Sequence, residues 1–469
     1  MGKTYIADKE TLDKCYAILS ADGIYGFIEH MDVLSPTARI EYIGQNKDFT
    51  PISLNKDTGT MTLNSWADFP IIVANKPWMV RADGTPDYRL DENDYTKKED
   101  GTASDVSNTS YNGGAFSWLA KIYKQEYMLG NDRVVKFSMR ERDGFEPVGF
   151  KDPNNNVLEG VWIPMFYGSI LGADTSTPKM VSLAGLQPCY NNTTDKEHTA
   201  IANFSSRAAF LGGGIVQTIT DLLIMFAKST NSQEAYGYGN SSGYDASLAP
   251  TNGVKQNAVV GGGQFYGTKD AKSLNKIFHS IVLGTYQQWM RDPYTLLVNG
   301  RYKVSKNYTY DLTGAKYQDT GISLPKMFES DGSTQKYGIF YPHKYQTVPG
   351  FGAVPVHPCK GSTSTGGCDG LWQNVEIVAV ALRFGDCSNG TNAGLRDLNV
   401  SNTAGNAYRR CIVSTTKTTK NECPCFHPHT PAPIQQTTSR KCSFPDPKMY
   451  DIRLPNLPTA ASSHCQGFA

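Results

Sequence analysis

The clearest helical pattern lies near the middle of the chain. Residues 218–221 (Thr-Ile-Thr-Asp) have the spacing of a capping box, in which the acidic side chain reaches back to the amide of the first residue. Apolar residues then recur three and four positions apart, at Ile219, Leu222, Leu223 and Phe226. Such a stripe is typical of the core-facing side of an amphipathic helix, so we predict a helix here. Weaker patterns predict two further helices, over residues 9–20 and over residues 205–210, the second ended by three glycines.

Most of the remaining pattern indicates strands joined by turns and loops. Strand signals fill residues 23–77, and shorter runs follow at residues 160–168 and 376–384. Residues 231–267 are rich in Gly, Ser, Asn and Tyr, which indicates a long loop, and residues 91–100 mix both charges as solvated loops do. We therefore predict an α+β fold that is mainly β in its N-terminal part.

Composition and charge exclude several classes of protein. Lys plus Arg number 45 and Asp plus Glu number 44, so the net charge of +1 argues against a nucleic-acid groove or an anionic-membrane binder. The longest apolar run, residues 215–227, contains polar side chains and is too short to span a bilayer. Residues 1–14 lack the apolar centre of a secretory signal. We therefore expect synthesis and folding in a cytoplasm, without membrane insertion.

The ten cysteines are concentrated late in the chain, where eight of them follow position 358. In a reducing cytoplasm the expectation is buried free thiols. The alternative is a zinc site made by Cys423, Cys425, His427 and Cys442, since thiolates and imidazoles at this density can surround zinc. Ligands one residue apart face opposite ways in an extended chain, however, and the prolines between them stiffen it. We therefore expect no cofactor and keep zinc as the alternative.

No catalytic pattern in the sequence has the context that its chemistry requires. A Gly-x-Ser-x-Gly run occurs at residues 239–243, but it lies within the long loop region and not between a predicted strand and a helix, as a nucleophile elbow requires. In the glycine-rich run at residues 261–267, Tyr266 stands where a dinucleotide fingerprint requires its third glycine. The run that starts at Asp152 resembles the beginning of an EF-hand loop but lacks the required glycine and the final glutamate. We therefore expect a protein that is not an enzyme.

Several blocks of sequence, met in a fixed order, resemble a known protein type. The blocks are residues 83–102, residues 138–147, residues 221–233 with the pair Gly237 and Gly239, residues 361–369 (Gly-Ser-Thr-Ser-Thr-Gly-Gly-Cys-Asp), residues 392–395 (Asn-Ala-Gly-Leu) and residues 404–410. Over roughly residues 60–412 the chain is similar to phage fibre and host-tropism proteins. Their C-terminal domain has the C-type-lectin fold, in the variant shared with formylglycine-generating enzymes.

The resemblance implies a chain of three parts. Residues 1–150 would form a mainly β N-terminal attachment region, and residues 151–414 a C-type-lectin-like domain with two helices and long loops. Residues 415–469 would form an extended C-terminal arm that is rich in Pro and Cys. Its eight prolines prevent helix and favour extended chain, whose backbone groups must meet water or a partner. We therefore expect the arm to lie against a neighbouring subunit or another virion protein.

By the same resemblance the chain would be a bacteriophage virion surface protein, a head or tail fibre or a capsid decoration, that attaches to a host-surface glycan or protein. Such fibres gain stiffness and avidity as trimers, so we expect a homotrimer. Aromatic faces stack on sugar rings, and Arg forks bind carboxylates or hydroxyls. The ligand-binding residues that the resemblance implies are Trp372, Arg383, Arg396, Asp397, Tyr408 and Arg409.

Two other functions stay open at the level of sequence. One is a structural virion decoration or adaptor protein that binds no receptor. The other is an oxidoreductase of the formylglycine-generating type, which needs redox-active cysteines close together in a cleft. Cys359, Cys368, Cys387 and Cys411 fall in the expected domain, but their spacing differs from the active-site pattern of that family.

Overall fold

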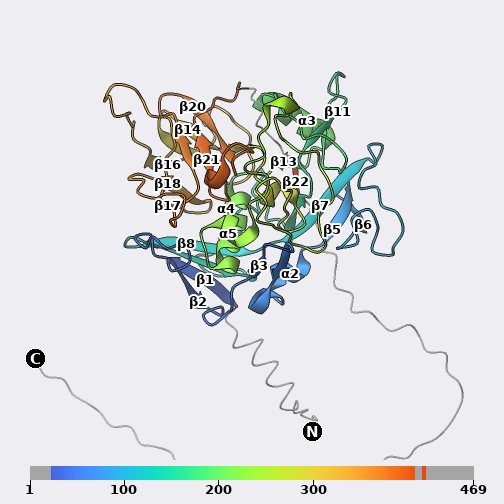
Figure 1. Cartoon of the computed structure of the whole chain (residues 1–469), viewed down its shortest axis with the longest axis horizontal. Coiled ribbons are helices and arrows are strands. Elements are labelled where there is room, and N and C mark those ends of the chain that lie inside the picture. The colour runs from blue at the N-terminus through green and yellow to red at the C-terminus, as the bar shows by residue number, and fades with distance from the viewer. Residues whose placement is uncertain (1–22, 407–414, 419–469) are drawn as a thin grey trace, which may run out of the picture. The chain divides into compact units, whose positions relative to one another are not determined.

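The chain folds into three larger β-sheets with few helices, as the computed structural model describes it for residues 23–406 and for the backbone of residues 415–418. The described part is therefore α+β and mainly β, which confirms the predicted fold class. Figure 1 shows helix α4 (Gly214–Ala227) near the centre of this part of the chain, with strands of the first sheet on one side of it.

The first sheet is antiparallel and has the order β2-β1-β9-β8. Its strands are β1 (Ile24–Glu29), β2 (Ile40–Gly44), β8 (Tyr123–Leu129) and β9 (Asp132–Ser138). The register places Gly26 opposite Lys136, where a Cβ atom on Gly26 would lie 2.4 Å from the carbonyl oxygen of Val135. Glycine therefore permits the close pairing of β1 with β9, which fixes the direction of the Glu29 side chain at the end of β1.

The second sheet combines segments that are far apart in sequence and has the order β13-β22-β10-β7-β5-β6. Its strands are β5 (Pro77–Arg81), β6 (Pro86–Arg89), β7 (Gly113–Ala120), β10 (Gly160–Pro164), β13 (Ala208–Phe210) and β22 (Thr415–Thr418). The strand β22 lies between β10 and β13 and is antiparallel to both. The first residues of the expected C-terminal arm are therefore part of a sheet.

The third sheet has the order β16-β15-β14-β20-β21-β19. Its strands are β14 (Met290–Val298), β15 (Arg301–Val304), β16 (Gln318–Ser323), β19 (Leu371–Gln373), β20 (Val378–Arg383) and β21 (Leu398–Val400). Three hairpins complete the strands: β3 (Ser53–Asn55) with β4 (Thr60–Thr62), β11 (Ser169–Leu171) with β12 (Lys179–Val181), and β17 (Lys344–Val348) with β18 (Gly352–Val356). Long irregular segments, residues 324–343 and 357–370, connect the later strands.

The α-helices of the described residues are α2 (Pro70–Ala74), α3 (Thr194–Phe204), α4, α5 (Ser232–Tyr236) and α6 (Ile281–Gly284), with 3-10 turns η1 (Asn64–Trp66), η2 (Ala246–Leu248) and η3 (Gly390–Asn392). The predicted central helix is confirmed in α4, but it begins at Gly214 rather than at a capping box. The hydroxyl of Thr218 donates to the carbonyl oxygen of Val148 at 2.9 Å and caps nothing.

The helix predicted over residues 205–210 is wrong. Ser205 is the residue that ends α3, and residues 208–210 form β13 instead. The segment is too short for a second helix, and pairing with β22 satisfies its backbone. The helix predicted over residues 9–20 lies outside the described residues.

One hydrophobic core joins the described residues on both sides of position 150. It includes Phe27 of β1, Phe116 of β7, Ile163 of β10, Phe226 of α4 and Leu395, all of them buried. A second cluster of buried residues lies against the third sheet. The expected boundary near residue 150 therefore does not separate two cores, because β7 and β10 are neighbours in one sheet across it.

Candidate functional site

Three of the sequence blocks that carry the resemblance meet in the folded chain. The amide of Leu395 donates to the hydroxyl oxygen of Ser232 at 3.1 Å, and the side chain of Gln233 donates to the carbonyl oxygen of Ala393 at 2.9 Å. The amide of Arg396 donates to a carboxylate oxygen of Asp369 at 2.8 Å. Segments that are between 27 and 163 positions apart are thus hydrogen-bonded into one unit near the end of α4.

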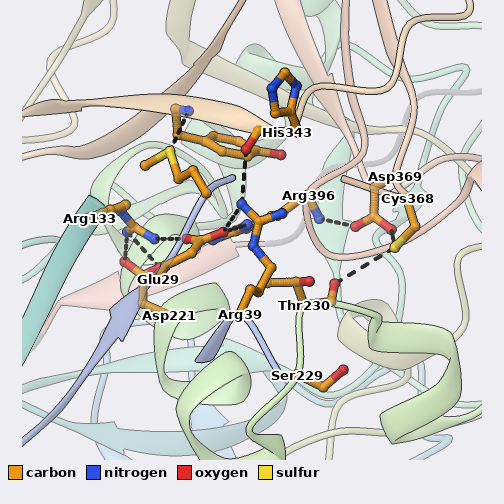
Figure 2. Close-up of polar contacts among 12 residues, drawn as sticks. Glu29, Arg39, Arg133, Asp221, Ser229, Thr230, His343, Cys368, Asp369 and Arg396 are labelled. Carbon is orange, nitrogen blue, oxygen red and sulfur yellow. Dashed lines mark hydrogen bonds and ion pairs between the residues drawn. The ribbon is translucent and has the colours of Figure 1, made fainter. Parts of the chain in front are cut away.

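A buried charge cluster fixes this unit to the first sheet (Figure 2). The carboxylate of Glu29 accepts from both terminal nitrogens of Arg396, each at 2.7 Å. The guanidinium groups of Arg39 and Arg133 approach the same carboxylate at 3.1 and 3.3 Å. Burial by itself would raise the pKa of Glu29, but Arg396 and Arg39 hold this pKa far below its usual range. Glu29 is therefore ionised in the folded chain.

The cluster continues to α4 through Arg133. Asp221 accepts from Arg133 at 2.7 and 2.6 Å and is also paired with Lys124, and the side-chain nitrogen Nε of Arg133 donates to Glu126 at 2.7 Å. Burial opposes the ionisation of Asp221, yet Arg133 and Lys124 lower its pKa. Asp221 is the residue that the sequence pattern placed in a capping box, and the structure gives it an ion pair instead.

Two arginines predicted to bind a ligand are buried in internal contacts. Arg396 is paired with Glu29, and its guanidinium lies 4.5 Å from the ring centre of Tyr345. Arg383 pairs with Asp292 at 3.0 Å, and both side chains are buried. Because buried ion pairs lose most of their water, neither guanidinium faces solvent as a ligand site on the surface requires. The structure thus assigns both arginines to holding the fold.

Asp397, also predicted to bind a ligand, is fully buried. Within the described residues neither of its carboxylate oxygens has a hydrogen-bond partner. Burial, and then the nearby carboxylates of Asp369 and Asp386, raise the pKa of Asp397 well above its usual value. Burial likewise raises the pKa of Asp369, to about 6. The surroundings therefore favour the protonated form of Asp397, because burial removes the water that would stabilise an ionised carboxylate.

Among the predicted ligand residues that the structure describes, Trp372 is the one that lies at a solvent-facing surface. Its indole contacts Trp289 edge-on, with ring centres 5.3 Å apart. It also lies against Gly338, where a Cβ atom would come within 2.5 Å of the indole. Next to it, Tyr337 and Ile339 are 48% and 38% exposed. We call Trp372, Tyr337 and Ile339 the Trp372 surface; sequence reasoning missed its last two members, which follow no motif.

The remaining predicted site residues lie outside the described part of the chain. They are Tyr408, Arg409 and the zinc candidates Cys423, Cys425, His427 and Cys442. Within the described residues, no three His, Cys, Asp or Glu side chains are placed to hold a metal ion.

The expectation of free thiols is confirmed for Cys359 and Cys368. Burial raises the pKa of both, to about 12 for Cys359. Both thiols are therefore protonated at neutral pH and are poor nucleophiles.

No family model matches the chain, and no curated protein is similar to it at a significant level. Among the described residues, no helix combines the length and apolar character needed to cross a bilayer.

Proposed function

We propose that this chain is a bacteriophage virion surface protein, a head or tail fibre or capsid decoration, that attaches the particle to the host surface. The observation that carries the proposal is the meeting of the resemblance blocks. Ser232 and Gln233 of the block 221–233 are hydrogen-bonded to Leu395 and Ala393 of the block 392–395. Asp369 of the block 361–369 accepts from the amide of Arg396, the residue that directly follows the block 392–395. The sequence blocks that carry the resemblance are thus also neighbours within one structural unit.

The arrangement of rigid and irregular parts supports a display function. The buried cluster around Glu29 holds the base of the unit, while residues 324–343 and 357–370 form long connections at its surface. Loops placed on a rigid scaffold can vary in sequence without loss of the fold. The Trp372 surface offers exposed aromatic and apolar side chains of the kind that stack on sugar rings or contact protein receptors.

The alternative of a formylglycine-generating oxidoreductase receives less support. That chemistry needs thiolates close together, whereas burial keeps Cys359 and Cys368 protonated. A structural decoration without receptor binding differs from the proposal only in what the exposed surfaces contact. We also propose that the protein is a homotrimer on the particle, in contact with other virion proteins, since several weak host contacts then act together.

Two measurements test the proposal. Immunogold labelling of particles with antibodies to the chain should mark the particle surface, and the purified full chain in excess should reduce adsorption of particles to host cells. Unlabelled particles would contradict the virion location, and labelled particles with unchanged adsorption would favour the structural decoration.

A matched pair of variants tests the Trp372 surface. Tyr337→Ala removes a side chain that is 48% exposed, so it should leave folding intact and weaken the competition for adsorption. Tyr244→Ala removes a side chain that is 51% exposed and lies outside the Trp372 surface, so it should have no effect. Equal competition by both variants would contradict the assignment of this surface.

A further inference from the structure

A hollow lined by described residues lies away from the Trp372 surface. It is an open groove of about 810 Å³, including the solvent at its mouth, between the β3–β4 hairpin and the segment that follows Val260. Grooves of roughly 300–1,000 Å³ are typical of small-molecule sites. Its lining residues are Thr58, Gly59, Thr60, Met61, Leu63, Asn93, Gly262, Gly263, Gln264, Phe265 and Tyr266.

The chemistry of this lining is neutral. It contains no charged side chain; the hydroxyl groups of Thr58 and Thr60, which are hydrogen-bonded to each other at 3.1 Å, and the side-chain amide of Asn93 line it together with the ring of Tyr266. The backbone amide of Asn93 donates to Asp91, whereas its side-chain amide makes no hydrogen bond within the described residues, and a Cβ atom on Gly262 would lie 3.1 Å from the side-chain oxygen. Neutral donors and acceptors next to an aromatic face suit a ligand that is rich in hydroxyl groups and has apolar C–H faces.

The aromatic wall of the groove is held in place by two glycines. A Cβ atom on Gly59 or on Gly261 would lie 2.3 Å from the ring of Tyr266, so both positions exclude any larger residue. The ring is therefore held against both the hairpin turn and the glycine segment along its Cδ2–Cε2 side. A ring that is fixed before the ligand arrives loses little side-chain entropy on binding.

The glycine segment is anchored from inside the protein. The buried ammonium of Lys276 donates to the carbonyl oxygen of Gly261 at 2.8 Å and to the hydroxyl oxygen of Tyr95 at 3.0 Å. The amide of His279 donates to the carbonyl oxygen of Gln264 at 2.8 Å. These contacts draw the segment's carbonyl groups inward and make Lys276 and His279 positioning residues for the groove, without contact to a ligand.

We propose that this groove binds a neutral saccharide, with a sugar ring against Tyr266 and sugar hydroxyls bonded to Asn93, Thr58 and Thr60. The inference rests on the proposed host attachment and names the class of ligand: an uncharged glycan segment. An acidic sugar is disfavoured, because no cationic side chain lines the groove to bind its carboxylate.

The test uses the purified full chain on an array of neutral and sialylated oligosaccharides. We expect binding to one or more neutral glycans and none to sialylated forms of the same glycans. The variant Gly262→Trp places an indole in the groove at an exposed position and should weaken this binding at least about 10-fold. Tyr266→Ala should weaken it as well, and its melting temperature will show whether the wall has kept its fold.

The matched control is Gly405→Trp, because Gly405 is also exposed and, among the described residues, a Cβ atom there meets no atom closer than 4.0 Å. It should bind like the unaltered chain. Absence of any neutral binder, or equal binding by Gly262→Trp and Gly405→Trp, would overturn the inference. If Gly262→Trp still competes fully for adsorption, only the groove assignment fails; if the unaltered chain fails to compete, the host-attachment proposal fails.

Discussion

Replacing Glu29 with Gln tests whether the buried charge cluster holds the fold together. The substitution keeps the shape of the side chain but removes the negative charge that Arg396, Arg39 and Arg133 share. Among the described residues, Arg133 keeps Asp221 and Glu126 as partners. Arg39 and Arg396 keep no carboxylate, so two guanidinium groups become buried without a counter-charge.

The expected loss of stability is large. Removing one partner of a buried ion pair costs about 3–5 kcal/mol, since the remaining charge stays out of water. Domains of ordinary size are stable by about 5–15 kcal/mol, so this single change removes a substantial share of the total. Glu29 and Arg396 have side chains that are 0% and 8% exposed, which places the pair in the buried class rather than the solvent-screened one.

Urea unfolding at pH 7, followed by tryptophan fluorescence, measures the effect. Glu29→Gln should lower the midpoint with little change in the dependence on urea. The control is Asp319→Asn, which breaks an ion pair with Arg301 whose side chains are 46% and 50% exposed, and should cost less than about 1 kcal/mol. A midpoint for Glu29→Gln equal to that of the control would refute the reasoning.

The pH dependence gives a second, independent reading of the same variant. The pKa of Glu29 is lowered in the folded chain, so its contribution to stability is present above its ordinary pKa, 4.5, and is lost as the pH falls below it. The difference in stability between the unaltered chain and Glu29→Gln should therefore shrink as the pH falls below about 4.5. A constant difference down to pH 3 would show that lost packing, and not lost charge, causes the effect.

Three further predictions follow from the structure. The pKa of Asp397 is raised in the folded chain, so ionising this residue destabilises the native state. In urea titrations from about pH 4 to pH 8, Asp397→Asn should therefore gain stability relative to the unaltered chain, and a constant difference in stability between the two would contradict this. Burial lowers the pKa of Lys276 in the folded chain from its ordinary 10.5 to about 7, so the unaltered chain should gain stability as the pH rises between these two values. Lys276→Met should lack this gain, and a variant whose stability rises as steeply would contradict the prediction. Deletion of residues 415–469 removes β22 from between β10 and β13 and should lower the melting temperature by on the order of 5 °C, whereas deletion of residues 419–469 should not; equal melting temperatures would show that β22 contributes nothing.

The sequence predicts the parts of the fold that depend on local periodicity. The apolar spacing around Leu222 and Leu223 predicts a helix because side chains three and four positions apart share a face. The runs of apolar residues at 160–168 and 376–384 likewise predict strands, and the structure has β10 and β20 within them. The helix start was missed because α4 begins with Gly214, a residue that no propensity rule favours there.

The burial of three predicted ligand residues, Arg383, Arg396 and Asp397, has a different origin. Charged side chains are usually exposed, so the sequence alone gives no reason to expect these side chains in the interior. Their surroundings come from segments far away in sequence, since Glu29 precedes Arg396 by 367 positions. Composition and spacing contain no signal for such a pair. The sequence does not predict the groove beside Tyr266 for the same reason, because Gly59 and Tyr266 come together only in the folded chain.

The source of the counter-charge for Arg396 decides how the chain can be divided. Glu29 lies on β1, and β10 pairs with β7, so the region after residue 150 draws both an ion pair and a strand partner from the region before it. A fragment of residues 151–414 would bury Arg396 unpaired and expose the backbone edge of β10. It would also lack β22, which begins at residue 415. The surfaces proposed to meet the host therefore depend on strands from both ends of the described chain, and variation in the loops beside Trp372 or Tyr266 leaves these strands unchanged.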